Sequence, residues 1–401
     1  MLALVQALTL SAGYNAAVVT VGAAILGVAA GACGTFMFLR KRALVSDALA
    51  HATLPGIVIA FMVMVGFGGD GRDLFGLLAG AAISATIGLL AVDAMVAHTR
   101  LSQDAAIGAV LSVFFGFGIV CLTVVQTMTA GRQAGLEAFL LGSTAGMLYG
   151  DAVTIAAGAA LCLGALLLLR RAMTVVAFDP QFAAASGFSV RLVDIAMMAL
   201  VLAVTVIGLR VVGLVLIVAL LIIPPVSARF WTDRAGVMVV LSAAFGGLAG
   251  YGGSAISAVA PALPTGSIVV LAAFAIFSIS FLFSPRRGLL AAALRRRGHE
   301  VRVHRRQGLL ALSKGEPVLD AMTLAVLRRE RLIRRDGVPT ELGRTEAAKA
   351  RLDEARWIAA RIALDPDALA SQSDVLTPIE DAFTADQIAT IDRHLQKPRA
   401  V

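Results

Sequence analysis

This chain is poor in charge and in cysteine, and each shortage excludes a class of protein. Charged residues make up 15% of the 401 residues and hydrophobic residues 59%, well above the roughly 45–50% apolar fraction of ordinary soluble domains. A mean hydropathy of +0.87 therefore excludes a soluble globular fold and predicts an all-α polytopic membrane protein. The three cysteines, Cys33, Cys121 and Cys162, are widely spaced in apolar runs, so neither a disulfide framework nor a zinc pattern is expected.

Two further absences bear on processing and activity. No Lys or Arg precedes Arg40, so the N-terminus lacks the basic region of a secretory signal peptide, and the first apolar segment is expected to be retained. No G-x-x-x-x-G-K-[ST] phosphate loop occurs in the chain. We therefore do not expect the chain to hydrolyse ATP itself, and we expect no tightly bound cofactor.

Long apolar runs dominate the first two thirds of the chain, and runs of about 18–24 residues are long enough to cross a bilayer. Nine such runs lie at 16–39, 48–67, 74–97, 105–128, 150–170, 192–209, 211–230, 236–258 and 265–284. The stretch 193–230 is too long for one crossing, and the only plausible turn within it lies around Arg210. The sequence predicts eight to nine transmembrane helices.

The apolar character ends near Pro285. Residues 1–284 hold 12 of the 34 Lys and Arg and 10 of the 26 Asp and Glu, although they are most of the chain. This contrast predicts a transmembrane domain at 1–285 and a water-soluble domain at 286–401. Because positively charged segments stay in the cytoplasm, the C-terminal domain is expected there and the N-terminus outside.

Asp47 and His51 are ionisable residues in an apolar run, where a charged side chain costs at least ~2.5–3.5 kcal/mol. Their i,i+4 spacing places them on one helical face, and a carboxylate beside an imidazole suits Mn, Fe or Zn. Pro55 offers no N–H to the carbonyl of His51, so one helical turn can present a carboxylate, an imidazole and a free carbonyl. The alternative is that Asp47 caps the helix or pairs with Arg40–Arg42 while His51 packs against another helix.

A second proline break, Pro224-Pro225, frees the carbonyls of Leu220 and Leu221. It precedes a segment in which aromatic and charged side chains alternate, and such a segment either docks into a groove on a partner or ends a helix with an interfacial Trp. The candidate residues are Arg229, Trp231, Asp233 and Arg234.

Six motifs in order resemble the permease subunits of metal-type ABC importers, the family that carries zinc, manganese or iron(II). They cover nearly the whole apolar part of the chain. The motifs are GTFMFLRKRALVSDALAHATLPGIVIAF (34–61), DAAIGAVLSVFFGFGIV (104–120), LEAFLLGSTAGM (136–147), FDPQFAAASGF (178–188), VVGLVLIVALLIIPPVSARF (211–230) and LPTGSIVVLAAFAIFSISFLFSPRRGLL (263–290).

The resemblance implies a type II importer-like fold in a bacterial inner membrane. It implies three partners: a cytoplasmic ABC ATPase, an extracytoplasmic metal-binding protein, and a second copy of the permease or a related one. It also implies that Asp47 and His51 line the metal path. One cytoplasmic loop would couple to the ATPase. Arg229–Arg234 is favoured because it follows the proline break, and the loop with Asp179, Gln181 and Gly187 is the alternative. One departure from the family pattern is Ala262, where an acidic residue is common.

The C-terminal extension resembles the winged-helix domain of iron- and manganese-dependent repressors, at about 305–365. It is expected to be a helix, a short basic turn and a second helix from Thr340, followed by a helical segment like the one after the repressors' winged helix. Its arginines suit anionic membrane lipid as well as nucleic acid phosphates, and DNA binding is not expected.

These observations predict a permease that moves Mn²⁺, Fe²⁺ or Zn²⁺ into the cytoplasm on ATP hydrolysed by a separate subunit. Two other classes stay open. A secondary, proton-coupled metal transporter would use Asp47 and His51 as a proton relay, although its usual inverted repeats are not evident. A membrane-tethered, metal-responsive regulator would use the C-terminal domain as its working part.

Overall fold

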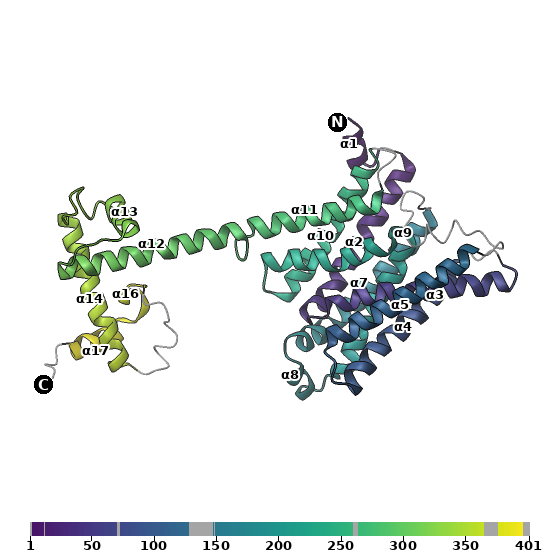
Figure 1. Ribbon diagram of the computed structural model, residues 1–401, viewed down its shortest axis with the longest axis horizontal. Coiled ribbons are helices and arrows are strands. Elements are labelled where there is room, and N and C mark those ends of the chain that lie inside the picture. The colour runs from purple at the N-terminus through teal and green to yellow at the C-terminus, as the bar shows by residue number, and fades with distance from the viewer. Residues whose placement is uncertain are drawn as a thin grey trace. The chain divides into compact units, whose positions relative to one another are not determined.

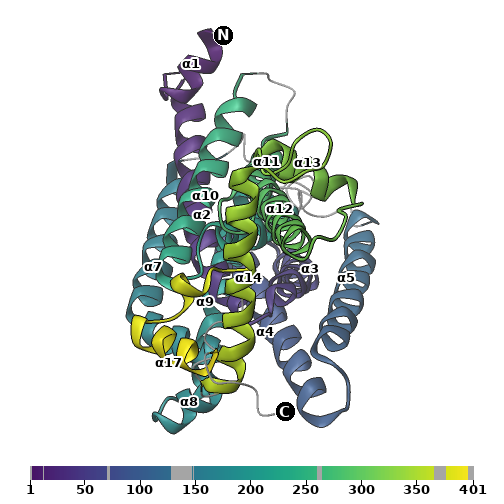
Figure 2. The ribbon, with the colours of Figure 1, turned by 90° about the vertical axis from the view of Figure 1, so that its left-hand side faces the viewer.

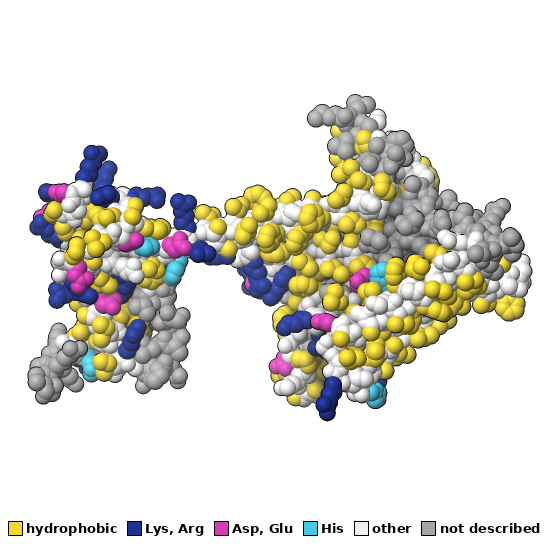
Figure 3. Space-filling view, viewed as in Figure 1, with side chains coloured by type: hydrophobic (Ala, Val, Ile, Leu, Met, Phe, Trp, Pro, Cys, Tyr) yellow, Lys and Arg dark blue, Asp and Glu magenta, His cyan; other side chains and the backbone are white. Residues whose placement is uncertain are grey.

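The computed structural model describes residues 2–11, 13–69, 73–127, 147, 149–259, 264–364 and 376–395. The chain divides into two compact units, Met1–Leu289 and Leu290–Val401. Hydrophobic side chains cover most of the visible face of the first unit, while Lys and Arg gather on the second (Figure 3). This matches the change in composition near Pro285.

The first unit is a bundle of long helices preceded by a short helix, α1 (Leu2–Leu8). In the described part of the chain, eight helical segments are long and apolar enough to cross a membrane. The helices and their bounds are α2 (Tyr14–Leu39), α3 (Ala43–Gly66), α4 (Leu74–His98), α5 (Gln103–Thr127), α7 (Tyr149–Phe178), α8 (Pro180–Ala185), α9 (Val190–Trp231), α10 (Ala235–Ser257) and α11 (Thr265–Phe283). Short α8 and α1 lie at opposite ends of the unit (Figures 1 and 2).

Helix α9 reverses direction along its length. A Cβ on Gly208 would lie 2.6 Å from Cδ1 of Ile217, whereas nine residues of straight helix span about 13.5 Å. Helix α9 also contacts the same end of α2 at two distant positions. Asp194 pairs with Arg40, and the Leu221 carbonyl lies against Gly34. The expected turn thus falls within a backbone that stays helical over 42 residues.

This reversal bears on the expected count of crossings. The first arm of α9, Val190–Gly208, has 19 residues and is one of the eight segments of the described residues that are long enough to span. The second arm contains the apolar helical segment Leu216–Trp231 and is the remaining candidate for a crossing. The described residues therefore agree with the prediction of eight to nine transmembrane helices.

Small residues bring α2 and α10 into backbone contact. A Cβ on Gly27 would meet the carbonyl of Gly246, one on Gly31 would meet that of Ser242, and one on Gly250 would meet that of Ala23. These three contacts follow one antiparallel register, so the close approach runs along both helices. In lipid, helices associate through such close packing, because the surrounding acyl chains are as apolar as the helices and the hydrophobic effect does not drive their association.

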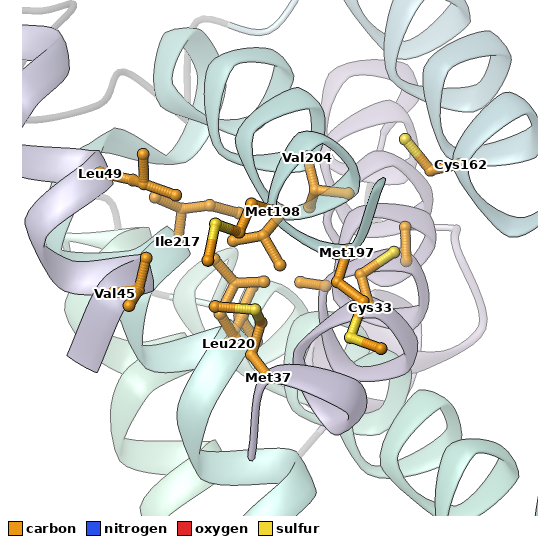
Figure 4. Packing of buried hydrophobic residues seen from close by; sticks show 14 of the residues in the cluster. Cys33, Met37, Val45, Leu49, Cys162, Met197, Met198, Val204, Ile217 and Leu220 are labelled. Atoms are coloured by element: carbon orange, nitrogen blue, oxygen red, sulfur yellow. The ribbon is translucent and has the colours of Figure 1, made fainter. Parts of the chain in front are cut away.

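Two hydrophobic clusters fill the membrane unit. The larger one joins α2, the first half of α3, the second half of α4, α5, α7, both arms of α9, and α10 and α11. Figure 4 shows part of it, with Met198 and Val204 from the first arm of α9 beside Ile217 and Leu220 from the second. The smaller cluster joins the second half of α3 to α4 and α5 and meets α9 at Val206. Helices α3–α5 thus have a small core of their own away from the Arg40 end.

The second unit is also helical. Its elements are α12 (Leu289–Lys314), α13 (Ala321–Arg329), α14 (Glu341–Ala363), α16 (Ile379–Ala382) and α17 (Ala385–Leu395). The expected helix, turn and helix are confirmed as α13, the turn and α14, and the Thr340 hydroxyl caps α14 by accepting a hydrogen bond from the Gly343 amide at 3.0 Å. Among the described residues the turn forms one isolated β-bridge, Ile333 to Pro339, and not a two-stranded wing.

Three arginines of the second unit each bind two carboxylates. Arg305 joins Glu330 and Glu346. Arg306 of α12 joins two neighbouring carboxylates of α14 at 3.1 and 2.6 Å, and Arg356 of α14 joins carboxylates of α16 and α17 at 3.2 and 2.8 Å. Because each pair links different elements, these ion pairs fix how α12, α14 and α17 pack.

A candidate metal-path site on α3

Asp47 and His51 face one another on α3, as their spacing predicts. The distance from His51 Nε2 to Asp47 Oδ1 is 3.5 Å, and the two side chains are 21% and 32% exposed. This distance is longer than a normal N–H···O hydrogen bond of about 2.7–3.2 Å. In the described part of the chain, no group of three or more His, Cys, Asp and Glu could hold a metal ion. One chain thus offers two candidate ligands at this point.

The pair lies against α5. The rings of His51 and Phe115 meet nearly at right angles, with centroids 4.9 Å apart. Three residues further along each helix, a Cβ on Gly118 would lie 2.6 Å from Cδ2 of Leu54, so the two helices run parallel in one register. Phe115 could not be singled out beforehand, because no sequence pattern indicates which helix covers His51.

Pro55 lies inside α3 without ending it. Directly after it, a Cβ on Gly56 would meet the carbonyl of Gly80, and one on Gly80 would meet that of Gly56. The turn that follows His51 is therefore pressed against α4. The release of the His51 carbonyl to a polar path stays a prediction.

The arginines near Asp47 have another partner. Arg40 donates from Nε to Oδ1 of Asp194 at 3.0 Å and from Nη2 to Oδ2 at 2.6 Å, and Arg42 lies 3.5 Å from the same carboxylate. A third donor atom of Arg40 binds the carbonyl of Val176 at 3.2 Å. The Arg40 guanidinium thus ties the end of α2 to α7 and α9. The alternative that Asp47 pairs with these arginines finds no support in this geometry.

Arg40 directly follows the apolar run 16–39, and Asp194 lies near the start of the run 192–209. Opposite charges at the ends of two apolar runs were the available signal for this pair. The partner itself could not be chosen, because other runs also end in charged residues.

The second proline pair, Pro224-Pro225, lies inside α9. The Leu221 carbonyl that Pro225 leaves without its helical donor lies against Gly34 of α2, where a side chain would collide with it. This carbonyl is covered by protein, as an unpaired backbone group in a membrane must be. Whether Pro224 and Pro225 border the metal path stays a prediction.

The candidate segment Arg229–Arg234 closes onto α11. The Trp231 indole donates to Oγ of Ser280 at 2.9 Å, and the Ser284 hydroxyl donates to the Phe230 carbonyl. Asp233 pairs with Arg229 at 3.2 Å and with Arg287 at 2.6 Å. The segment is the last turn of α9 and the start of α10, where Arg234 is the N-cap residue without a side-chain capping bond.

The other candidate loop contains the separate helix α8. Asp179 caps it by accepting from the Phe182 amide at 2.9 Å, and Gly187 ends it with φ of +85°, a conformation that favours glycine. Gln181 is exposed, as are three phenylalanines of this loop: Phe178, Phe182 and Phe188. Exposed aromatics around a capped helix make α8 a protruding apolar feature.

Two parts of the expected site lie outside the described residues. The motif at 136–147 falls there except for Met147, and so does Ala262. Their expected roles stay predictions.

The fold and this pair define a helical polytopic membrane protein with an ionisable pair in its bundle. The chain matches the ABC 3 transport family over residues 14–284, and it belongs to this family. It is 37% identical over 294 residues to the manganese transport system membrane protein MntC of Bacillus subtilis. This alignment covers 73% of this chain and 66% of that relative.

It is also 38% identical over 284 residues to the zinc transport system membrane protein TroC of Treponema pallidum, covering 71% of this chain and 94% of that one. Among solved structures it resembles PsaBC from Streptococcus pneumoniae in complex with Fab. That match has a TM-score of 0.58 and 28% identity, and it covers 67% of this chain and 91% of that chain.

Proposed function

We propose that this protein is the membrane permease of an ATP-binding-cassette importer that moves a divalent transition metal into the cytoplasm. Its family and its relatives named for manganese and zinc transport support this reading. The sequence has no phosphate loop, so a separate subunit would hydrolyse ATP. Manganese, zinc and iron(II) are the candidate ions.

The observation that carries the proposal is the spacing of Asp47 and His51. Oxygen and nitrogen ligands lie about 2.0–2.2 Å from a transition metal such as zinc. Two ligands about 2.1 Å from one ion and about 110° apart would be separated by about 3.4 Å. The Nε2 to Oδ1 distance of 3.5 Å fits this bite, whereas it is too long for a strong hydrogen bond.

Two ligands from one chain make an incomplete shell, since a structural zinc site has four. A second permease, either another copy or a related chain, would complete it by presenting the same pair across a twofold axis. An ion held at the junction of two chains is released when the chains part. This suits a transport path better than a closed site within one subunit.

Of the two candidate loops for the ATPase, the geometry favours the one with α8. Trp231 and Asp233 already bind partners on α11 or directly after it. The side chains of Arg229–Arg234 thus contribute to packing within the bundle. Helix α8 instead exposes Phe182, and an aromatic side chain is a common anchor in a binding pocket. Residues Asp179–Gly187 are therefore the proposed ATPase contact.

The positive-inside rule would put α8 and the Arg40 end of the bundle in the cytoplasm, together with the C-terminal unit. An extracytoplasmic metal-binding protein would then meet the opposite end of the bundle. The membrane would be the bacterial inner membrane.

The C-terminal unit is proposed to have an assembly or regulatory role with a winged-helix-like arrangement. Helices α13 and α14 with their bridged turn support this relation. The exposed arginines of the turn, including Arg334 and Arg335, are proposed to face anionic lipid headgroups.

The decisive experiment measures uptake of a panel of divalent ions, with the neighbouring ATPase co-expressed. Asp47→Ala and His51→Ala should each abolish uptake while the complex still purifies with its ATPase. Asp93→Ala and His98→Ala are matched controls, because both side chains are exposed near the end of α4, and they should transport normally. Wild-type uptake by both α3 variants would remove the pair from the path, and uptake independent of the ATPase would favour a secondary transporter.

A further inference from the structure

The imidazole of His51 has an unusual environment for a metal ligand. Its Nδ1 atom is buried and has no hydrogen-bond partner among the described residues. A neutral imidazole carries one N–H and one lone pair, so a metal bound at Nε2 leaves the proton on Nδ1. Histidines that bind metals almost always donate that proton to a carboxylate, a carbonyl or water, which raises ligand basicity. Here the donor would face no acceptor.

The ring of Phe115 packs against the His51 imidazole. Its edge-to-face contact with His51 restricts rotation of the imidazole and keeps a hydrocarbon surface beside it. The contact is built into the helix pairing, because Gly118 lets α5 approach Leu54 in the same register. Phe115 is itself 41% exposed, so this ring does not fill the core of the bundle.

We infer that Phe115 is a positioning residue that keeps His51 a weak, releasable metal ligand by denying its Nδ1 a hydrogen-bond acceptor. This inference rests on the proposed function, in which Asp47 and His51 contact the transported ion. Loss of an outer-shell partner typically costs 10–100-fold in metal affinity. A transport site gains from that loss, because an ion held too tightly would not leave.

Supplying an acceptor should therefore tighten binding and slow transport. In Phe115→Gln the side-chain carbonyl can accept from Nδ1, and we expect Mn²⁺ affinity to rise about tenfold while the maximal uptake rate falls. Affinity is measured on the purified permease with its ATPase, by titrating Mn²⁺ and reading the unbound ion from its electron paramagnetic resonance signal. Uptake is measured with the same complex in proteoliposomes together with its binding protein.

A matched variant separates this effect from damage. Phe117→Gln puts the same amide at an exposed phenylalanine two residues along α5, on another face of the helix, and should leave affinity unchanged. A merely structural role predicts weaker binding and slower uptake together, the opposite of the tightening expected for Phe115→Gln.

The outcomes also separate this inference from the proposed function. If Mn²⁺ binding is absent in wild type or survives Asp47→Ala and His51→Ala, the proposed site is wrong. If those variants lose binding but Phe115→Gln binds no tighter than Phe117→Gln, only the role of Phe115 is overturned.

Discussion

The ion pair between Arg40 and Asp194 gives the sharpest prediction about stability. Its two side chains are only 14% and 13% exposed, and the bidentate geometry is that of a strong charge-assisted pair. Removing one partner of a buried pair costs about 3–5 kcal/mol, whereas exposed pairs contribute about 0–1. Because this pair is nearly buried but sits at the end of the bundle, we expect Asp194→Asn to lower the free energy of unfolding by about 3 kcal/mol.

The assay is denaturant unfolding of the purified permease in detergent. Asp93→Asn is the control, because Asp93 is exposed on α4, and its effect should stay within about 0.5 kcal/mol. The double variant Arg40→Met, Asp194→Leu should be less destabilised than Asp194→Asn, since it leaves no guanidinium without its carboxylate. If Asp194→Asn unfolds like Asp93→Asn, the pair does not hold α2, α7 and α9 together.

Three further predictions concern other parts of the chain. Gly250→Ala should destabilise the bundle by about 1–3 kcal/mol because its Cβ would strike the α2 backbone, whereas Gly252→Ala, with open space around it, should be neutral or slightly stabilising in the same unfolding assay. Hydrogen bonds from Thr323 lower the pKa of Asp320, and Lys349 and Arg305 lower that of Glu346, from ordinary values of 3.8 and 4.5. Both carboxylates thus contribute stability above those values and lose it as the pH falls through their lowered pKa values. Protection from hydrogen exchange in the second unit, taken relative to the intrinsic exchange rate at each pH, should therefore fall below about pH 4 and stay constant between pH 6 and 8. Deleting residues 290–401 should leave metal uptake in proteoliposomes largely intact, and complete loss in a truncated protein that still binds its ATPase would favour the regulator reading.

The sequence predicted most of what depends on local pattern. Apolar runs located the long helices because a span must satisfy its own backbone hydrogen bonds. The i,i+4 rule brought Asp47 to His51, since that spacing depends on one helix alone. The turn within the run 193–230 followed from its length, because one crossing needs only about 20 residues.

What the sequence could not supply was the pairing between helices. Arg40 had Asp47 near it along the chain, yet its partner is Asp194 on α9. The contact between Phe115 and His51 depends on the register of α5 against α3, which Gly118 sets through close packing. Single-sequence patterns carry no information about such register, so the residues around His51 emerge only from the fold.

The separate small core of α3–α5 has a mechanical consequence. These helices join the main cluster through residues near Val45 and Leu49, while their other half packs mainly on itself and meets α9 at Val206. Asp47 and His51 lie in the half that shares the main cluster, so the spacing of this pair depends on the main core. A displacement of the other half of α3–α5 would leave that spacing unchanged.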